Sequence, residues 1–176
     1  MELSAGQLKA FDDQGYVFFP NCFSENEIVL LRAEAESILK LDRQEVWREK
    51  TGAPRTAFAA HTFSEVFSLL ARHPRLIEPL RQLFGEDVYV HQFKLNAKAA
   101  FEGDVWQWHQ DYGTWARDDG MKSILFSGVT TRTLDNGAQA RKFAGRRALT
   151  VPSQSCASNP AALLIVVCDP LCGPTG

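Results

Sequence analysis

The chain has 176 residues, a length typical of one domain, and its 45% hydrophobic and 23% charged residues exclude disorder as its overall state. The net charge of -2 gives no electrostatic signature of a nucleic-acid or anionic-membrane partner. The longest apolar run, Ala161–Cys168, is too short to cross a bilayer, and the N-terminal segment lacks the basic and apolar stretches of a signal peptide. The four cysteines do not make a disulfide framework. We therefore expect a soluble, cytoplasmic protein.

The composition changes near residue 121. Residues 1–121 contain 13 Lys and Arg and 19 Asp and Glu, whereas residues 122–176 contain 6 and 2. Of the 19 aromatic residues, 17 precede residue 122, as do all four histidines, and three of the four cysteines follow it. No linker separates the two parts, and the second is small for a domain of its own. The sequence thus predicts a first part of ordinary composition followed by an atypical tail.

Local signals predict that the first half of the chain is mostly helical. Ser4 and Ser24 each stand three positions before a Gln or Glu, the spacing of a capping box that begins a helix. Apolar residues then recur at helical spacing, and Gly15 and Gly85 are suitable stops. The expected elements are a helix over 5–14, a strand over Tyr16–Pro20, a helix over 25–41, a loop over 42–62, and helices over Ser64–Arg72 and Arg75–Phe84.

The pattern then changes to the two-residue period of strands. Val105–Tyr112 predicts a Trp-rich strand, preceded by a longer strand over Val88–Ala99. After Met121 only Ile124–Thr133 and Ala161–Val167 indicate further strands, and the basic, Gly-rich stretch over 137–147 has no clear period. Helices followed by strands favour an α+β or β-barrel-like domain. In the longer strand the even-numbered positions form a mostly polar face: Val88, Val90, Gln92, Lys94, Asn96 and Lys98.

His109 and Asp111 form a His-x-Asp motif on the second of these strands. Residues i and i+2 of a strand point to the same face about 6.6 Å apart, so the imidazole and the carboxylate can bind one cation. A second His from elsewhere would complete the two-His-one-carboxylate triad of non-haem iron enzymes. Taken alone, the tripeptide favours a surface strand with a His–Asp hydrogen bond. The surrounding sequence therefore decides between that interpretation and an iron site. A zinc site at Cys168 and Cys172 is disfavoured because no second ligand pair accompanies them.

The context is the segment HQFKLNAKAAFEGDVWQWHQDYGTWARDDGM, which resembles the phytanoyl-CoA dioxygenase (PhyH) family and, within it, the ectoine hydroxylase-like branch. WHQDYGTW followed by DGM is a specific string for that branch, and RTAFAAHTFSEVF is also similar to the family. The resemblance implies an α+β fold in which N-terminal helices pack on a double-stranded β-helix (a cupin-like jelly roll). It also implies Fe(II), 2-oxoglutarate and O₂, with hydroxylation of a small-molecule substrate.

The resemblance further implies which residues bind the iron and its co-substrate. His109 and Asp111 match two iron ligands, and Lys98 matches a lysine that binds the 2-oxoglutarate carboxylate. Asn96 lies on the same polar strand face and is expected to contribute to co-substrate binding. A lysine ammonium suits a carboxylate as a compact point charge. Without the resemblance, Lys98 and Lys94 would be interpreted as a solvated strand face.

Other residues are matched to the substrate pocket. Gln92 matches a position that contacts the substrate, and Trp115 matches an aromatic residue that shapes the pocket. On a regular strand Trp106 and Trp108 face away from His109, so we expect them to pack in the core.

The resemblance ends near Met121. The family then has further strands, which bring a second iron-binding His and a group for the distal carboxylate of 2-oxoglutarate. No His follows His109, and residues 122–176 do not align with the family. A shifted reading frame or an alternative C-terminus is the leading hypothesis, with the jelly roll incomplete at its end. The alternative function is a truncated, inactive family member that lacks the second His, since His61 and His91 are expected to be structural.

Overall fold

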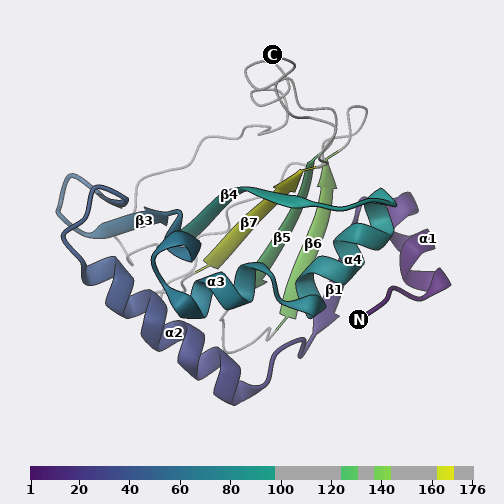
Figure 1. Ribbon diagram of the computed structural model, residues 1–176, viewed down its shortest axis with the longest axis horizontal. Helices are drawn as coiled ribbons and strands as arrows, with labels where there is room; N and C mark the ends of the chain where they lie inside the picture. The colour runs from purple at the N-terminus through teal and green to yellow at the C-terminus, as the bar shows by residue number, and fades with distance from the viewer. Residues whose placement is uncertain (98–123, 131–136, 144–161, 169–176) are drawn as a thin grey trace, which may run out of the picture.

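Helices precede most of the strands along the chain. The structure is a computed structural model that describes residues 1–97, 124–130, 137–143 and 162–168. Its helices are α1 (Ala5–Gln14), α2 (Glu25–Lys40), α3 (Glu65–Ala71), α4 (Pro74–Phe84) and the 3-10 turn η1 (Ala60–Thr62). Its strands are β1 (Tyr16–Pro20), β2 (Val46–Arg48), β3 (Pro54–Phe58), β4 (Tyr89–Asn96), β5 (Ile124–Thr130), β6 (Gly137–Phe143) and β7 (Ala162–Cys168) (Figure 1).

Serine capping boxes begin α1 and α2, as predicted. The Gln7 N–H donates to Ser4 Oγ at 3.3 Å, and the Gln7 side chain accepts from the Ser4 N–H at 2.9 Å. Ser24 and Glu27 repeat the arrangement at 3.3 and 2.7 Å. Gly85 ends α4 at φ 75°, a left-handed conformation that glycine adopts without steric cost. The four predicted α-helices are therefore confirmed to within one residue at each end, and in the described ranges no helix is long and apolar enough to cross a membrane.

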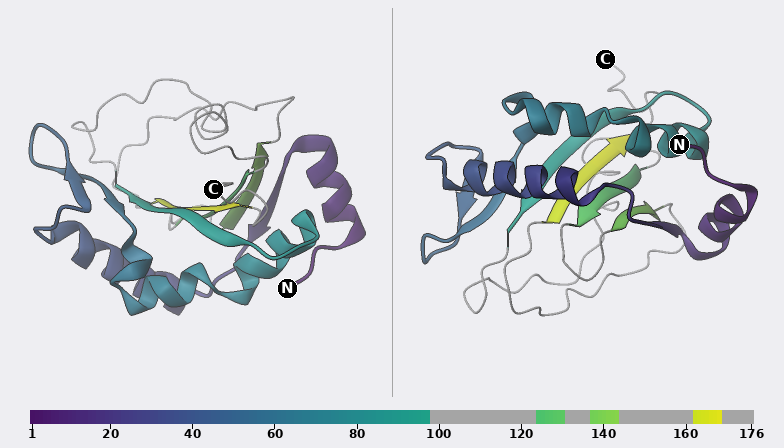
Figure 2. Two further views of the ribbon diagram at one scale, coloured as in Figure 1. Left: turned by 45° about the horizontal axis from the view of Figure 1, so that its top comes forward. Right: turned by 90° about the horizontal axis from the view of Figure 1, so that it is seen from below.

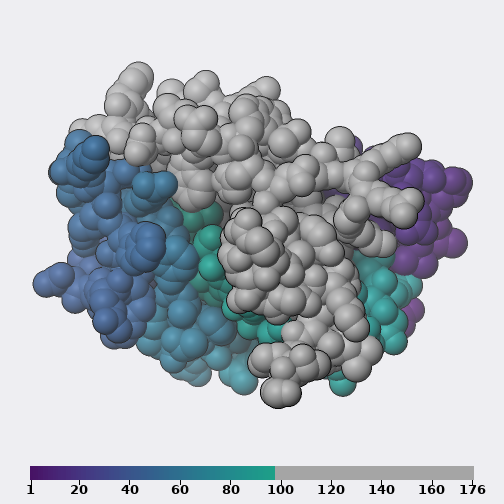
Figure 3. Space-filling model, turned by 90° about the horizontal axis from the view of Figure 1, so that it is seen from above, coloured from purple at the N-terminus to yellow at the C-terminus, as the bar shows by residue number. Residues whose placement is uncertain are grey.

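The seven described strands form one antiparallel sheet in the order β1-β6-β5-β7-β4-β3-β2. Helices α2, α3 and α4 lie across one face of this sheet (Figure 2). Helix α1 lies beside β1, at the opposite end of the molecule from the β2–β3 hairpin (Figure 3). Strand β4 therefore has helices on one side and is paired on both edges, with β7 and with β3.

The hydrophobic core lies between the helices and the sheet. Phe93 of β4 meets Phe67 of α3 edge to face, with ring centroids 5.7 Å apart. This packing holds one face of β4 against the helices and so fixes the direction of the opposite face. The largest fully buried side chains come from both layers: Phe11, Phe67, Phe93, Leu80 and Leu95.

Strand β4 contains a β-bulge at His91. Val90 and Gln92 pair with successive residues of β7, so His91 has no opposite residue in that strand. As a result, Val88 and Val90 pack against the core, although the regular alternation predicted them on the polar face. That prediction is wrong for these two valines because the bulge adds one residue to the strand. From Gln92 to Asn96 the predicted alternation is confirmed.

The predicted loop over 42–62 is wrong, because it contains β2, β3 and η1. Strand β3 pairs with β4 on one side and with β2 on the other. The charged and Gly/Pro-containing sequence lacks a local strand signal, and the backbone partners of β3 determine its structure. A register shift between Trp47 and Arg48 limits the length of β2.

Three strands beyond Met121 join the sheet. Strands β5 and β7 confirm the two weak strand signals of this region. Strand β6 was not predicted, and it pairs with β5 and with β1 near the start of the chain. Backbone hydrogen bonds between strands do not depend on the side-chain pattern. Strand β6 can therefore pair although its sequence has no clear alternating period. The α+β arrangement of helices on a sheet is as predicted, whereas the described residues show a single sheet and not the second sheet of a jelly roll.

Candidate functional site

The face of β4 that points away from the helices carries polar side chains. Gln92, Lys94 and Asn96 alternate with the buried Phe93 and Leu95. The three polar residues are half-buried. Because the core fixes the two apolar residues between them, the polar residues form an ordered row, here called the β4 polar row.

Asn96 is hydrogen-bonded across the strands to Thr56. The two residues lie directly opposite each other in β4 and β3, and Thr56 Oγ1 donates to Asn96 Oδ1 at 3.1 Å. Thr56 is only 3% exposed. Next to this pair, the Ala97 N–H donates to the Arg55 carbonyl at 2.9 Å. The amide of Asn96 is therefore held by a buried hydroxyl on a paired strand.

Lys94 lies next to an aromatic pair. Its Nζ is 5.5 Å from the centroid of the Phe58 ring, within the range of a cation–π contact. Phe58 in turn meets Trp47 edge to face, with centroids 4.8 Å apart, and Trp47 is 59% exposed on β2. A positive charge beside aromatic rings suits a ligand that combines an anionic group with apolar carbon atoms.

Gln92 has an unsatisfied polar atom. Its Oε1 is buried and has no hydrogen-bond partner within the described part of the chain. A buried acceptor without a partner costs free energy, commonly about 1–3 kcal/mol, unless a donor is supplied. The position therefore fits a bound molecule that donates an N–H or O–H to this oxygen.

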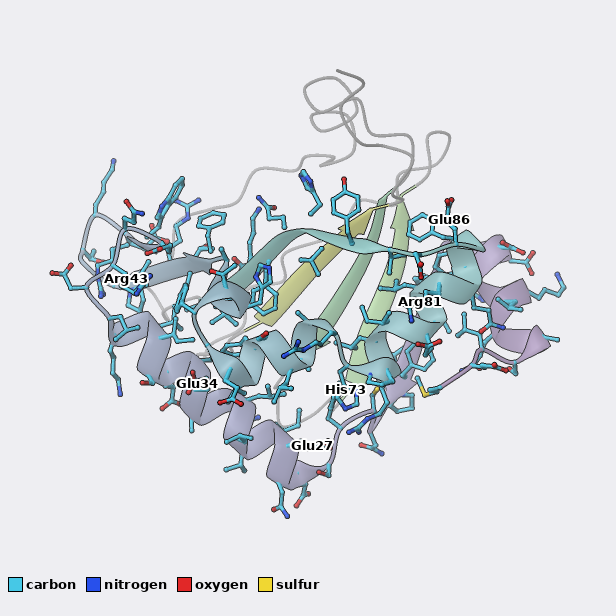
Figure 4. All side chains as sticks on the ribbon, viewed as in Figure 1. Glu27, Glu34, Arg43, His73, Arg81 and Glu86 are labelled. Atoms are coloured by element: carbon cyan, nitrogen blue, oxygen red, sulfur yellow. The ribbon has the colours of Figure 1, made fainter. Side chains whose placement is uncertain are left out.

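The structure describes three of the histidines. His61 and His73 lie away from the β4 polar row, and His91 lies at its end. His61 stacks on Phe93 with centroids 4.9 Å apart, and burial lowers the pKa of its ring. His73 precedes α4, where its Nδ1 accepts from the Arg75 N–H at 3.1 Å, and it lies near Glu27 (Figure 4). His91, at the bulge, meets a tyrosine ring. The interpretation of His61 as a structural residue agrees with its packing against a core phenylalanine.

Of the six residues predicted to form the site, the structure describes two. Gln92 and Asn96 lie on one strand face, as expected, and their binding roles stay predictions. Among the described residues, no group of three or more His, Cys, Asp or Glu is arranged to hold a metal ion. The other four predicted residues lie outside the described ranges: Lys98, Trp115, His109 and Asp111.

Thr56, which is bonded to the β4 polar row, has no counterpart among the residues predicted from the sequence. It falls in the region predicted as a loop, so no partner was assigned to it. The only local signal is the β-branched side chain two residues before Phe58, which is compatible with a short strand. Its relation to Asn96 comes from the β3–β4 register and is not visible in either segment alone.

Comparison with known proteins identifies relatives with named activities. "Ectoine dioxygenase" from Halomonas elongata is 40% identical over 139 residues, which cover 76% of this chain and 42% of that protein. The corresponding protein of Bordetella bronchiseptica is 35% identical over 139 residues, covering 76% and 45%. "L-proline trans-4-hydroxylase" from Streptomyces griseoviridis is 39% identical over 125 residues, covering 69% and 47%. The chain spans less than half the length of these curated relatives.

Solved structures show the same fold. The crystal structure of EctD from S. alaskensis with 2-oxoglutarate and 5-hydroxyectoine matches with a TM-score of 0.79 at 23% identity, covering 94% of this chain and 76% of that one. The non-heme alpha ketoglutarate dependent carbocyclase SnoK matches with a TM-score of 0.70 at 16% identity, covering 95% and 84%. These similarities extend the fold relationship beyond the ectoine-related proteins.

The family model of phytanoyl-CoA dioxygenase (PhyH) matches residues 11–139. This range contains α2–α4, β1–β5 and the segment with the His-x-Asp motif. It also continues past Met121, where the resemblance read from the sequence ended. Since the match covers well over half of its residues, the chain belongs to the phytanoyl-CoA dioxygenase (PhyH) family.

Proposed function

We propose that the protein is an Fe(II)- and 2-oxoglutarate-dependent dioxygenase that hydroxylates a small polar metabolite. The observation that carries this proposal is the β4 polar row on a PhyH-family sheet, with a fixed amide on Asn96 and a buried oxygen on Gln92 that has no partner among the described residues. Relatives named as ectoine dioxygenases and a proline hydroxylase support the reaction class. The EctD structures with iron and with 2-oxoglutarate support the cofactor and co-substrate.

We propose that His109 and Asp111 bind the iron, since an imidazole and a carboxylate suit Fe(II). Lys98 and Asn96 would bind 2-oxoglutarate, because an ammonium and an amide N–H both donate to a carboxylate. The donor set therefore fits the group that the family uses. When bound, iron and 2-oxoglutarate supply the activation of O₂, for which amino-acid side chains have no equivalent.

Gln92 and Trp115 would bind the substrate. Because Gln92 Oε1 is buried and has no partner in the part of the chain that the structure describes, it favours a substrate that presents an N–H or O–H group at this point. An indole at position 115 would supply a rigid apolar wall that excludes water. A small polar molecule with both hydrogen-bond donors and carbon atoms meets both requirements. Ectoine and L-proline, named by the relatives, are the first compounds to test.

The test is an anaerobic titration of the whole chain with Fe(II) in the presence of 2-oxoglutarate. We expect a saturable charge-transfer band in the visible spectrum. The variants H109A and D111A should lose the band, whereas H73N should keep it. Asparagine preserves the cap of α4, so this control removes an imidazole that caps a helix and lies outside the β4 polar row.

The same titration distinguishes the alternative. A folded wild-type chain that gives no band with excess Fe(II) and 2-oxoglutarate contradicts the proposed function and favours a family member without a working iron site. If the band forms, aerobic turnover of 2-oxoglutarate to succinate, stimulated by ectoine or L-proline, tests the hydroxylase activity itself.

A division between residues 1–121 and an atypical tail over 122–176 remains part of the proposal. The change in charge and aromatic content near residue 121 supports it, whereas the family match runs on to residue 139. The nucleotide sequence around codon 121 tests a shifted reading frame. A frame-corrected tail without family-like sequence would contradict that origin.

A further inference from the structure

We infer that Thr56 is a positioning residue for the co-substrate: its hydroxyl orients the Asn96 amide so that the amide N–H₂ is presented to the carboxylate of 2-oxoglutarate. The inference rests on the proposed function, in which Asn96 contacts 2-oxoglutarate. Its structural basis is the hydrogen bond from Thr56 Oγ1 to Asn96 Oδ1 at 3.1 Å.

The position of Thr56 is tightly determined. It pairs with Asn96 in β4 on one side and with Trp47 in β2 on the other, so its strand is not at the edge of the described sheet. It is 3% exposed, which keeps water from competing for its hydroxyl. A β-branched residue in a strand has a restricted χ1 angle. The hydroxyl is therefore a fixed donor on a fixed strand.

The direction of this hydrogen bond matters for an anion. A side-chain amide has an acceptor end and a donor end, and rotation by 180° exchanges them. When Oδ1 accepts from Thr56, Nδ2 is the end that can donate to a carboxylate. In the turned-over amide, which the hydroxyl can also hold by accepting from Nδ2, Oδ1 would face the anion and repel it; the bond therefore limits the amide to two orientations, and the carboxylate selects the one that donates. Thr56 thus increases the fraction of molecules in which Asn96 is ready to bind, and apparent affinity scales with that fraction.

The discriminating variant is T56V, which keeps the shape of the side chain and removes the donor. We expect the dissociation constant of 2-oxoglutarate, measured from the charge-transfer band, to rise about three- to tenfold, as for the loss of one hydrogen bond. T56S keeps the hydroxyl and should recover most of the affinity. T62V removes a hydrogen bond from a hydroxyl of η1, 2.8 Å from the carbonyl of the preceding Ala59, and should leave the affinity unchanged.

A double-mutant cycle separates positioning from a general structural effect. If Thr56 acts only through Asn96, T56V should weaken 2-oxoglutarate binding in the wild-type background and have no effect in the N96A background. Thermal melts of all variants show whether the sheet is intact. In turnover, T56V should raise the KM for 2-oxoglutarate more than it lowers kcat.

The possible failures are distinct. Absence of 2-oxoglutarate binding by the wild-type chain overturns the proposed function and this inference with it. Binding by the wild type that T56V leaves unchanged overturns the inference alone. Equal weakening by T56V with and without Asn96 also overturns it, because Thr56 would then act by another route.

Discussion

Gln82 binds the backbone of Leu3 with both ends of its side-chain amide. Oε1 accepts from the Leu3 N–H at 2.6 Å, and Nε2 donates to the Leu3 carbonyl at 3.0 Å. The two residues are 79 positions apart, so this pair joins the end of α4 to the segment before α1. The contrast with Gln92, whose Oε1 has no partner in the described residues, suggests a matched pair of substitutions.

We predict that Q82L lowers the free energy of unfolding by about 1–2 kcal/mol, because it leaves two backbone groups of the buried Leu3 without their partners. Q92L should be close to neutral or slightly stabilising, since the oxygen that it removes has no hydrogen bond to any described residue. Urea denaturation at neutral pH measures both. A larger loss for Q92L than for Q82L would contradict this account.

Arg75 connects α4 to the start of α2. Its guanidinium donates to the Cys22 carbonyl and to the Glu27 carboxylate, and it lies 4.5 Å from the centroid of the Phe23 ring. We predict that R75M costs about 1–2 kcal/mol, because charged hydrogen bonds to two partners are lost together.

The control is the exposed ion pair of Lys9 with Asp13 in α1, whose side chains are 76% and 57% exposed. K9M should change stability by less than about 0.5 kcal/mol. Thermal melts of the two variants test the difference. Similar shifts for both would show that Arg75 has no more effect than a surface charge.

Glu27 predicts a pH dependence of stability. The hydrogen bond from Arg75, followed by that from the Ser24 backbone, lowers the pKa of Glu27 to about 2. Because this lies below the ordinary value of 4.5, the stabilisation is present above about pH 4.5 and is lost as the pH falls towards 2. E27Q keeps the capping arrangement, as Gln7 does in α1. The stability difference between wild type and E27Q should therefore shrink between about pH 5 and 2 in urea titrations.

His61 predicts a second dependence at higher pH. Burial lowers the pKa of its ring below the ordinary 6.5, and its buried Nδ1 has no partner within the described ranges. The unfolded chain therefore binds the proton first as the pH falls, and stability declines below about pH 6.5 until the folded-state pKa is reached. H61F keeps an aromatic ring against Phe93 and should reduce this decline. An unchanged slope between about pH 7.5 and 5.5 would contradict the prediction.

The helices could be predicted because their signals are local. Ser24 and Glu27 lie within one turn, and the apolar spacing that follows them is contained in α2 itself. Strands β3 and β6 could not be predicted in this way, because their partners are far away in the chain. The short sequences of these strands are compatible with a loop until those partners are present.

The candidate site could be predicted only in part, because only some of its features are local in the sequence. The alternation of Gln92 and Asn96 is contained in one strand, so the sequence placed them on one face. Thr56 reaches Asn96 through the register of two strands, and no local pattern encodes that register. The bulge at His91 was missed as well, because an extra residue looks like ordinary alternation until the neighbouring strand is known.

The bulge also affects which changes in length β4 can accept. Removal of one residue from an ordinary strand exchanges its two faces from that point onward. Removal of His91 would instead make Val90 and Gln92 adjacent while both kept their present partners in β7. At this position, an insertion in an ancestor or a later deletion would therefore leave the amide of Gln92 on the face that points away from the helices.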